Sequence, residues 1–128
     1  MTRINVIPVT ELTDKHLLAE YRELPRIFGA ARKWHERGGR VRDLPKHYRL
    51  GGGHLLFFYN KLQWCFARQR QLVAECKRRG FHVTYEPTSD LIDWAPYYLL
   101  SGYMPTRVAL RINRERINDR LLAASQRR

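Results

Sequence analysis

The sequence predicts an all-α fold: a single compact domain of three main helices covering residues 1–128. Apolar side chains recur at helical spacing in three long stretches, whereas strand-like alternation is confined to a short N-terminal segment. A chain of 128 residues suits one hydrophobic core, and no internal repeat or low-complexity tract divides it. We therefore expect three helices packed around one core, with a long basic loop and an extended N-terminal segment packed against the helices.

The first predicted helix covers residues 13–37, with Thr13 or Asp14 as its N-cap and Gly38 after its end. Pro25 is expected to kink this helix without dividing it, because the apolar period continues past the proline. One face carries an apolar stripe formed by Leu17, Tyr21, Leu24, Phe28 and Ala31. The opposite face carries a row of cations formed by Lys15, Arg22, Arg26, Lys33 and Arg37.

Two irregular segments flank this helix. Residues 1–12 alternate apolar and polar side chains, so that Ile4, Val6 and Val9 are expected to pack against the helices. Residues 38–53 are basic and rich in glycine, which predicts a long surface loop. Loops of this length often carry function.

The second half of the chain is expected to supply the other two helices. An apolar helical period runs through residues 54–79 and stops at Gly80. Residues 81–106 combine aromatic side chains with three prolines, which predicts coil with at most a short helix. The third helix should begin at Thr106 or Arg107 and end near Ala124.

The charge balance points to nucleic acid as the partner. Lysine and arginine number 24 against 12 acidic residues, giving a formal charge of +12. These cations are spread through the helices and loops among 44% hydrophobic residues. Such a distribution is typical of a folded domain with a basic surface and excludes a disordered polycation.

Several other classes of site are excluded or disfavoured. Cys65 and Cys76 share one helix face and are expected to be buried thiols, without a metal signature or a disulfide framework. Glycines 51–53 with His54 lack the lysine and hydroxyl of a nucleotide-binding loop. We interpret them as a flexible lead into the second helix, with DNA phosphate at that helix N-terminus as the alternative. No apolar run is long enough for a signal peptide or membrane span, which predicts a cytoplasmic protein.

Thr2 is a candidate nucleophile through its α-amine. A small residue after Met1 is what methionine aminopeptidases accept, so the mature chain is expected to start at Thr2. An α-amine with a pKa of about 7.7 to 8.0 is roughly 10 to 20% neutral at pH 7, far more than a lysine. Neutral amines attack electrophilic carbon to form imines. The alternative is an ordinary α-amine without catalytic function.

Glu23 and His16 are candidate partners of that amine. Glu23 projects between the apolar stripe and the cations, where a carboxylate can position an amine or move protons. The alternative is an exposed glutamate paired with Arg26. His16 is close in angle to Glu23 and can reach the same site or a phosphate, or it is a surface residue.

Cations at helical spacing predict contacts to phosphate. Arg22, Arg26 and Lys33 lie on one face of the first helix, and Arg116 and Arg120 are four residues apart on the third. Such spacing suits a nucleic-acid backbone. The alternative, a solvated charged face, is weakened because acidic partners are few.

The N-terminal residues carry a specific resemblance. Met-Thr-Arg-Ile-Asn at 1–5, His16, Ala-Glu-Tyr-Arg-Glu-Leu-Pro-Arg at 19–26 and Phe-Gly-Ala at 28–30 resemble the phage-type pyrimidine-dimer DNA glycosylases (endonuclease V). Further matches follow in order up to about Leu121, among them residues 40–43, 53–54, 57–59, 68–69, 74–76 and 79–81.

This resemblance implies an all-α DNA repair enzyme that excises cyclobutane pyrimidine dimers from ultraviolet-damaged duplex DNA. It implies that the Thr2 α-amine attacks the deoxyribose C1′ and forms a Schiff base. It also implies that Glu23 serves both base release and the β-elimination that nicks the strand, an apurinic/apyrimidinic (AP) lyase step. The duplex is kinked and a base opposite the lesion is flipped out.

The resemblance further implies which side chains contact DNA. It places Arg3, Arg22, Arg26, Arg116 and Arg120 on the DNA-binding surface and His16 near the catalytic pocket, and the basic stripe adds Lys33. It implies no metal and no organic cofactor. We expect a monomer that binds double-stranded DNA with pyrimidine dimers or abasic sites. The C-terminus lacks the family's aromatic tail, and Trp94, Tyr97 and Tyr98 are candidates for other stacking surfaces. The competing hypothesis is a non-catalytic DNA-binding or architectural protein that keeps the fold.

Overall fold

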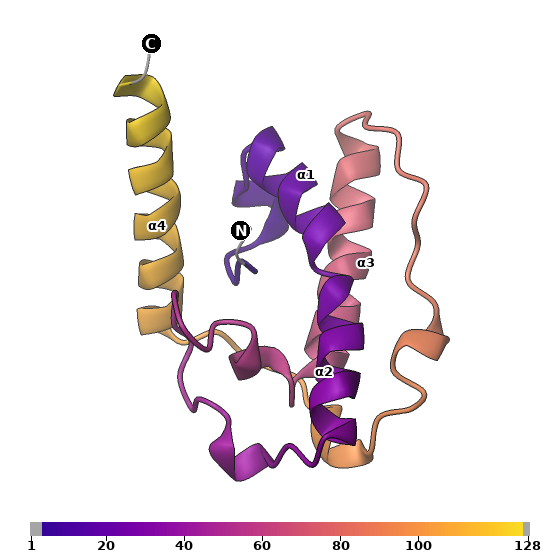
Figure 1. Cartoon of the computed structure of the whole chain (residues 1–128). Coiled ribbons are helices and arrows are strands. Elements are labelled where there is room, and N and C mark those ends of the chain that lie inside the picture. The colour runs from indigo at the N-terminus through magenta and orange to yellow at the C-terminus, as the bar shows by residue number, and fades with distance from the viewer. Residues whose placement is uncertain (1–3, 127–128) are drawn as a thin grey trace.

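A computed structural model describes residues 4–126 of the chain, and these residues fold into α-helices joined by short 3₁₀ turns and coil (Figure 1). Thr2 and Arg3, two of the predicted site residues, lie outside the described residues. The α-helices are α1 (Asp14–Glu23), α2 (Arg26–Glu36), α3 (Leu62–Arg78) and α4 (Arg107–Gln126). The 3₁₀ helices are η1 (Val9–Glu11), η2 (Val41–Asp43), η3 (Leu56–Phe58), η4 (Ser89–Leu91) and η5 (Tyr97–Leu99). The predicted all-α class is confirmed.

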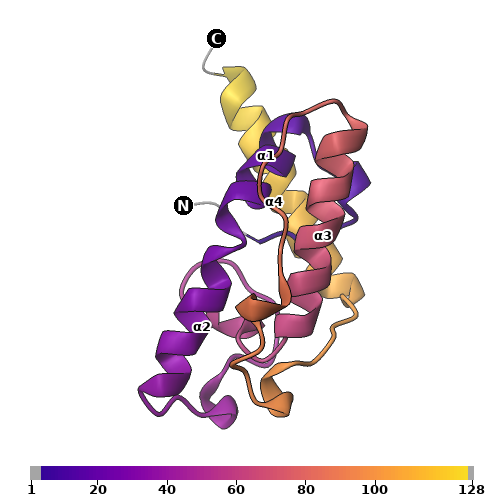
Figure 2. The ribbon, with the colours of Figure 1, turned by 90° about the vertical axis from the view of Figure 1, so that its right-hand side faces the viewer.

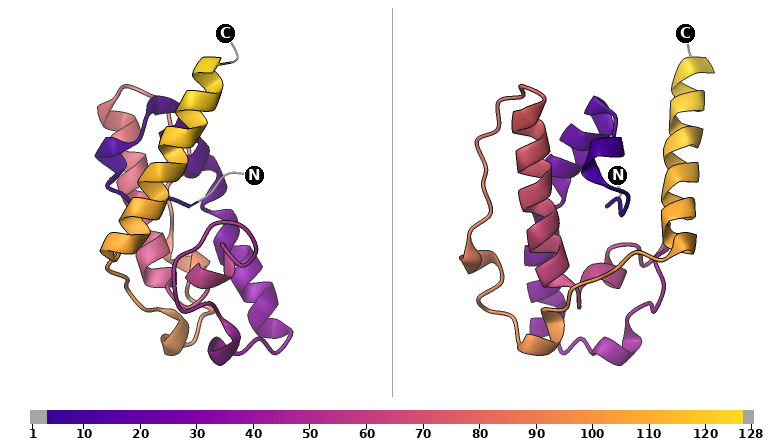
Figure 3. Two further views of the ribbon diagram at one scale, coloured as in Figure 1. Left: turned by 90° about the vertical axis from the view of Figure 1, so that its left-hand side faces the viewer. Right: turned by 180° about the vertical axis from the view of Figure 1, so that it is seen from behind.

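The helices enclose the N-terminal segment. Figure 1 and the rear view in Figure 3 both show the segment that begins at Ile4 between α3 and α4, with α1 beside it. Helix α2 continues from α1 along the lower part of α3 (Figure 2). The coil after α3 first returns over the faces of α1 and α3 (Figure 2), where the Tyr85 amide donates to the hydroxyl of Tyr21. It then crosses to the start of α4 (Figure 3).

The predicted helix over residues 13–37 is divided, which corrects the expectation of a kink. Thr13 caps α1 as predicted, because its hydroxyl accepts a hydrogen bond from the amide of His16. Pro25 has no N–H to donate, so the regular hydrogen-bond pattern is lost there. The amides of Ile27 and Phe28 instead bond to carbonyls three residues back. The backbone keeps helical dihedrals at Leu24 and Pro25, so α2 starts at once in a new direction.

The second predicted helix starts later than expected, at Leu62 rather than at residue 54. Gly51 and Gly53 adopt positive φ values of 69° and 83°, and Lys61 has a non-helical backbone just before α3. The apolar spacing of residues 54–61 comes from an aromatic cluster in which Phe57 and Phe58 lie edge-on to each other. The predicted flexible lead into a helix is therefore wrong: this segment is a turn that ends in a buried histidine, His54.

Other predicted features are confirmed. Helix α4 begins at Arg107, residues 81–106 contain only short 3₁₀ turns, and Gly80 ends α3 with a positive φ of 86°. Ile4 and Val6 are buried in the same core as the α1, α2 and α3 stripes. Cys65 and Cys76 are buried free thiols, and burial raises the pKa of both. Across residues 4–126, no helix has the length and apolar character needed to cross a membrane.

Candidate functional site

The first described residues run through the interior without regular secondary structure. Residues 4–7 are all buried, so their backbone groups need partners from elsewhere in the protein. The Ile4 amide donates to Nε2 of His54 at 2.9 Å, and the Tyr48 hydroxyl donates to the Ile4 carbonyl at 3.0 Å. Side chains of the long loop therefore hold both polar groups of Ile4.

Asn5 and its neighbours are held by two helices. The Asn5 amide and side-chain nitrogen both donate to Oε1 of Glu20 on α1, at 3.3 and 2.8 Å. On the other side, Oδ1 of Asn113 on α4 accepts from the amides of Val6 and Ile7 at 2.6 and 3.1 Å. Nδ2 of Asn113 donates to Oδ1 of Asn5 at 2.7 Å. One side chain of α4 thus contacts three consecutive residues.

A buried ion pair completes this arrangement. Arg68 of α3 donates to both carboxylate oxygens of Glu20, at 2.8 and 3.1 Å, and to the carbonyl of Ile7 at 2.5 Å. Both side chains of the pair are almost fully excluded from solvent. We call the five side chains that hold residues 4–7 the cradle. They are Glu20, Tyr48, His54, Arg68 and Asn113.

Glu23 occupies a different environment from Glu20. It is the last residue of α1, its side chain is 33% exposed, and its carboxylate lies 3.1 Å from the guanidinium of Arg26. This is the ion pair named as the alternative interpretation of Glu23. The carboxylate that contacts the described N-terminal residues is that of Glu20, three residues earlier and buried.

His16 lies close to two predicted DNA-binding residues of α4. It is half-buried, and its Nδ1 lies 2.7 Å from the Thr13 hydroxyl oxygen. Burial lowers the pKa of His16, and the positive charges of Arg116, Lys15 and Arg120 lower it further. The charges of Arg116 and Arg120 on α4 therefore act on the His16 side chain of α1.

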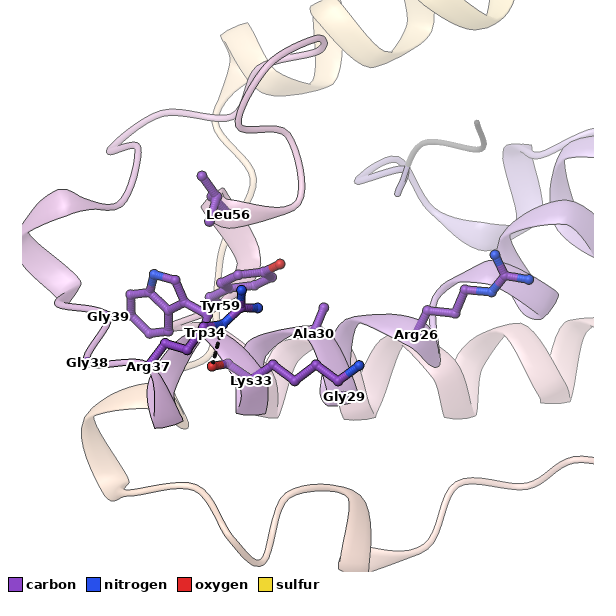
Figure 4. A pocket seen from close by; sticks show the side chains of 10 residues that line it. All are labelled: Arg26, Gly29, Ala30, Lys33, Trp34, Arg37, Gly38, Gly39, Leu56 and Tyr59. Carbon is purple, nitrogen blue, oxygen red and sulfur yellow. Dashed lines mark hydrogen bonds between the residues drawn. The ribbon is translucent and has the colours of Figure 1, made fainter.

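Arg26 and Lys33 belong to a second basic region, an open pocket of about 750 Å³ on α2 and the loop after it (Figure 4). Arg37 joins them, and its Nε donates to the Lys33 carbonyl at 3.3 Å. The rings of Trp34 and Tyr59 form the apolar part, with centroids 5.6 Å apart. We call this the basic pocket; it also includes Gly29, Ala30, Gly38, Gly39 and Leu56.

Gly39 has no side chain and so leaves room for the indole ring of Trp34 against the loop. A Cβ atom at Gly39 would sit 2.2 Å from the Trp34 ring, far inside contact distance. Arg22, the remaining predicted cation of the α1–α2 face, is exposed and lies near enough to α3 to oppose the raised pKa of Cys76. The predicted DNA-binding residues thus fall into separate groups and do not form one stripe.

The sequence reasoning did not identify the cradle. Its signal was nevertheless present, because Glu20 stands between Leu17 and Leu24 on the apolar stripe of α1. Arg68 and Asn113 have the same relation to Leu72 of α3 and Ile117 of α4, and all three are buried. A charged or amide side chain on an apolar stripe requires a buried partner. Among residues 4–126, no group of three potential metal ligands comes together.

These observations define a class: a basic helical protein with an anchored N-terminal segment and an exposed cationic surface, suited to a polyanionic partner. The model of the pyrimidine dimer DNA glycosylase family matches residues 1–89. The chain belongs to this family, whose members are DNA glycosylases of DNA repair and whose substrate is DNA with pyrimidine dimers. The match includes α1, α2 and α3, whereas α4 lies beyond the matched residues.

Proposed function

We propose that this chain is a bifunctional DNA glycosylase and AP lyase that excises cyclobutane pyrimidine dimers. The Thr2 α-amine is the nucleophile, and Glu23 moves the protons. The observation that supports this most directly is the cradle, which anchors backbone groups from Ile4 onward. Burying the polar backbone groups of residues 4–7 costs free energy unless each is hydrogen-bonded, and the cradle supplies these bonds. Such anchoring is what a catalytic terminal amine requires for its positioning.

The reaction needs a neutral amine and a carboxylate. The amine forms a bond to C1′ of the damaged nucleotide while the C1′–N bond to the base breaks, and the base departs with the electron pair. Ring opening gives a Schiff base, which acidifies the C2′ proton. Removal of that proton expels the 3′ phosphate and breaks the strand. Glu23 is suited to this role because it remains partly exposed at the end of α1.

The cations supply the DNA contacts. Arg116 and Arg120 with His16 form one group, Arg26 and Lys33 in the basic pocket form another, and Arg3 and Arg22 add to them. Each cation that meets a phosphate releases counterions, so binding should weaken steeply with salt. We propose that the protein acts as a cytoplasmic, DNA-associated monomer on duplexes with pyrimidine dimers or abasic sites, without a metal or an organic cofactor.

Borohydride trapping tests the proposal. Protein whose N-terminus has been verified by mass spectrometry is incubated with ultraviolet-irradiated duplex and, separately, with an abasic duplex. The expected result is a covalent adduct that maps to Thr2, together with a nicked strand. Protein that still carries Met1 places its amine one residue, about 3.8 Å of chain, away and should be nearly inactive.

Glu23→Gln distinguishes an enzyme from a non-catalytic DNA-binding protein of the same fold. The second possibility agrees with the ion pair between Glu23 and Arg26. In an enzyme, this change abolishes strand cleavage while binding to irradiated duplex persists. Glu36→Gln, a change in an exposed carboxylate on α2, is the matched control. Demethionylated protein that binds the lesion but forms neither adduct nor nick would refute the catalytic proposal and leave the binding one.

A further inference from the structure

His54 is the cradle residue nearest to the start of the chain. Its Nε2 accepts the Ile4 amide, while Glu20 and Asn113 act on residues 5–7. Two residues of extended chain span about 7 Å. An anchor on the Ile4 nitrogen therefore limits the Thr2 α-amine to that radius, and no other described contact on an amide lies closer to the amine.

The imidazole of His54 is itself fixed in one tautomer. A carbonyl can only accept, so the 2.7 Å contact between His54 Nδ1 and the Arg49 carbonyl places the proton on Nδ1. Nε2 then carries the lone pair that receives the Ile4 N–H. The side chain is 2% exposed. The rings of Tyr48 and Phe58 lie edge-on to it, with centroids 5.5 and 5.6 Å away, so it has little room to turn.

The turn before His54 is built to hold this orientation. Gly51 and Gly53 both have positive φ values, which side chains with a Cβ rarely adopt. The guanidinium of Arg49 closes the turn by donating to the Gly52 carbonyl at 2.8 Å. The same turn therefore supplies the carbonyl that sets the tautomer and carries the ring that uses it.

We propose that His54 is a positioning residue for the catalytic amine: as a neutral imidazole it holds the Ile4 amide and so aims the N-terminal nucleophile at C1′. This role rests on the proposed function. It acts through the backbone of residues 2–4 and involves no contact with DNA. Its loss should therefore lower the rate of the chemical step while the affinity for DNA stays the same.

Two amide substitutions distinguish the two hydrogen bonds of the His54 imidazole, one to the Ile4 amide and one to the Arg49 carbonyl. In His54→Gln, the amide oxygen reaches the position of Nε2 and can still accept from Ile4. In His54→Asn, the shorter amide can still donate to the Arg49 carbonyl but does not reach Ile4. His82→Asn, a change in an exposed histidine after α3, is the matched control for the substitution itself. All proteins are compared after removal of Met1 and well below their unfolding temperatures.

The kinetic readout is single-turnover cleavage of an abasic duplex, with the dissociation constant for a non-cleavable abasic analogue measured in parallel. We expect His54→Asn to slow cleavage about 10- to 100-fold and His54→Gln only about threefold, with affinities within about twofold of the wild type. Equal rates for His54→Asn and His82→Asn would overturn the role. So would equal losses in both His54 variants, since a purely structural defect would not distinguish them.

A spectroscopic readout is independent of catalysis. Imidazole nitrogen–proton correlation spectra of the free protein at pH 7 should show His54 protonated at Nδ1 and bare at Nε2. A proton on Nε2 would overturn the role even in an active enzyme. Wild-type protein that shows the expected tautomer but forms no borohydride adduct would overturn the proposed function, and with it this role, while leaving the anchor itself established.

Discussion

The side chains of the cradle are buried and hydrogen-bonded to residues 4–7, whereas the cations of the basic pocket on α2 are exposed. In the cradle, Glu20 and Arg68 are excluded from water and share two hydrogen bonds. In the pocket, Arg26 is 77% exposed and pairs with the partly exposed Glu23. Buried polar contacts fix the positions of the groups that they join and stabilise the fold. Exposed cations attract a polyanion at long range and contribute little to stability. Substitutions in the two regions should therefore fail in different ways.

The largest effect is expected for Arg68→Met. This change leaves the Glu20 carboxylate buried without its counter-charge, and the Ile7 carbonyl without a donor. The free energy of unfolding should fall by about 3–5 kcal/mol, as measured by urea denaturation. Arg32→Met is the control, because the pair of Arg32 and Glu36 is exposed and should contribute less than about 1 kcal/mol. Similar losses in both variants would remove the contrast between the two regions.

Asn113→Ala should have the next largest effect. The amides of Val6 and Ile7 lose their acceptor and remain buried, which should cost about 2–3 kcal/mol in total. Asn118→Ala, a change in an exposed residue of the same helix, makes the same gain in helix propensity. The difference between the two unfolding free energies therefore isolates the cradle bonds. A difference near zero would show that water replaces them.

Lys33→Gln tests the pocket. It should leave the free energy of unfolding within about 0.5 kcal/mol of the wild type, because the side chain is exposed. The slope of log affinity for DNA against log salt should become shallower by about 0.9. Arg70→Gln, a change in an exposed cation on α3, serves for comparison. An unchanged slope for Lys33→Gln alone would place the DNA elsewhere.

Glu75 on α3 sharpens the comparison because it is a buried carboxylate whose partner Arg78 is largely exposed. Hydrogen bonds from Arg78 and Arg79 lower the pKa of Glu75 to about 2. An unfolded glutamate titrates at about 4.3. The pair therefore stabilises the fold above that value, and the stabilisation is lost as the pH falls towards 2.

The measurement is urea unfolding between pH 2 and 6. The free energy of unfolding of Glu75→Gln should lie below that of the wild type near neutral pH and converge with it as the pH approaches 2. Glu115→Gln, a change in an exposed glutamate 3.9 Å from Arg111, should give a curve parallel to that of the wild type. A gap that persists at pH 2 would mean that Glu75 acts through packing and not through its charge.

Local signals allowed much of this fold to be predicted. The predicted helix ends at Gly38 and Gly80 and the predicted start of α4 are correct, because glycine stops and helix caps act within a few residues. The predicted helix over residues 54–61 is wrong because apolar spacing alone cannot distinguish a helical stripe from an aromatic cluster. The error lies where tertiary contacts, not local propensity, decide the backbone.

The candidate site was less accessible to sequence reasoning. Glu20 and Glu23 differ by less than a turn, so the pattern alone could not decide which carboxylate faces the N-terminal segment, and the break at Pro25 blurs the register further. The contact of Asn113 with Val6 spans 107 residues. Pairings at that separation leave no periodic trace in the chain. The cations were predictable because exposed charges follow the helical period.

That long span has a consequence for how the protein is made. Helix α4 leaves the ribosome after α1, α2 and α3, so during synthesis Val6 and Ile7 stay without the acceptor that later holds them. We therefore expect aminopeptidases that act on nascent chains to reach Met1 before residues 4–7 are anchored. Stalled nascent chains that end before Arg107 should lose Met1 readily, whereas refolded full-length protein that still carries Met1 should lose it slowly. We therefore expect removal of Met1 to take place during synthesis, before α4 has formed its hydrogen bonds to Val6 and Ile7.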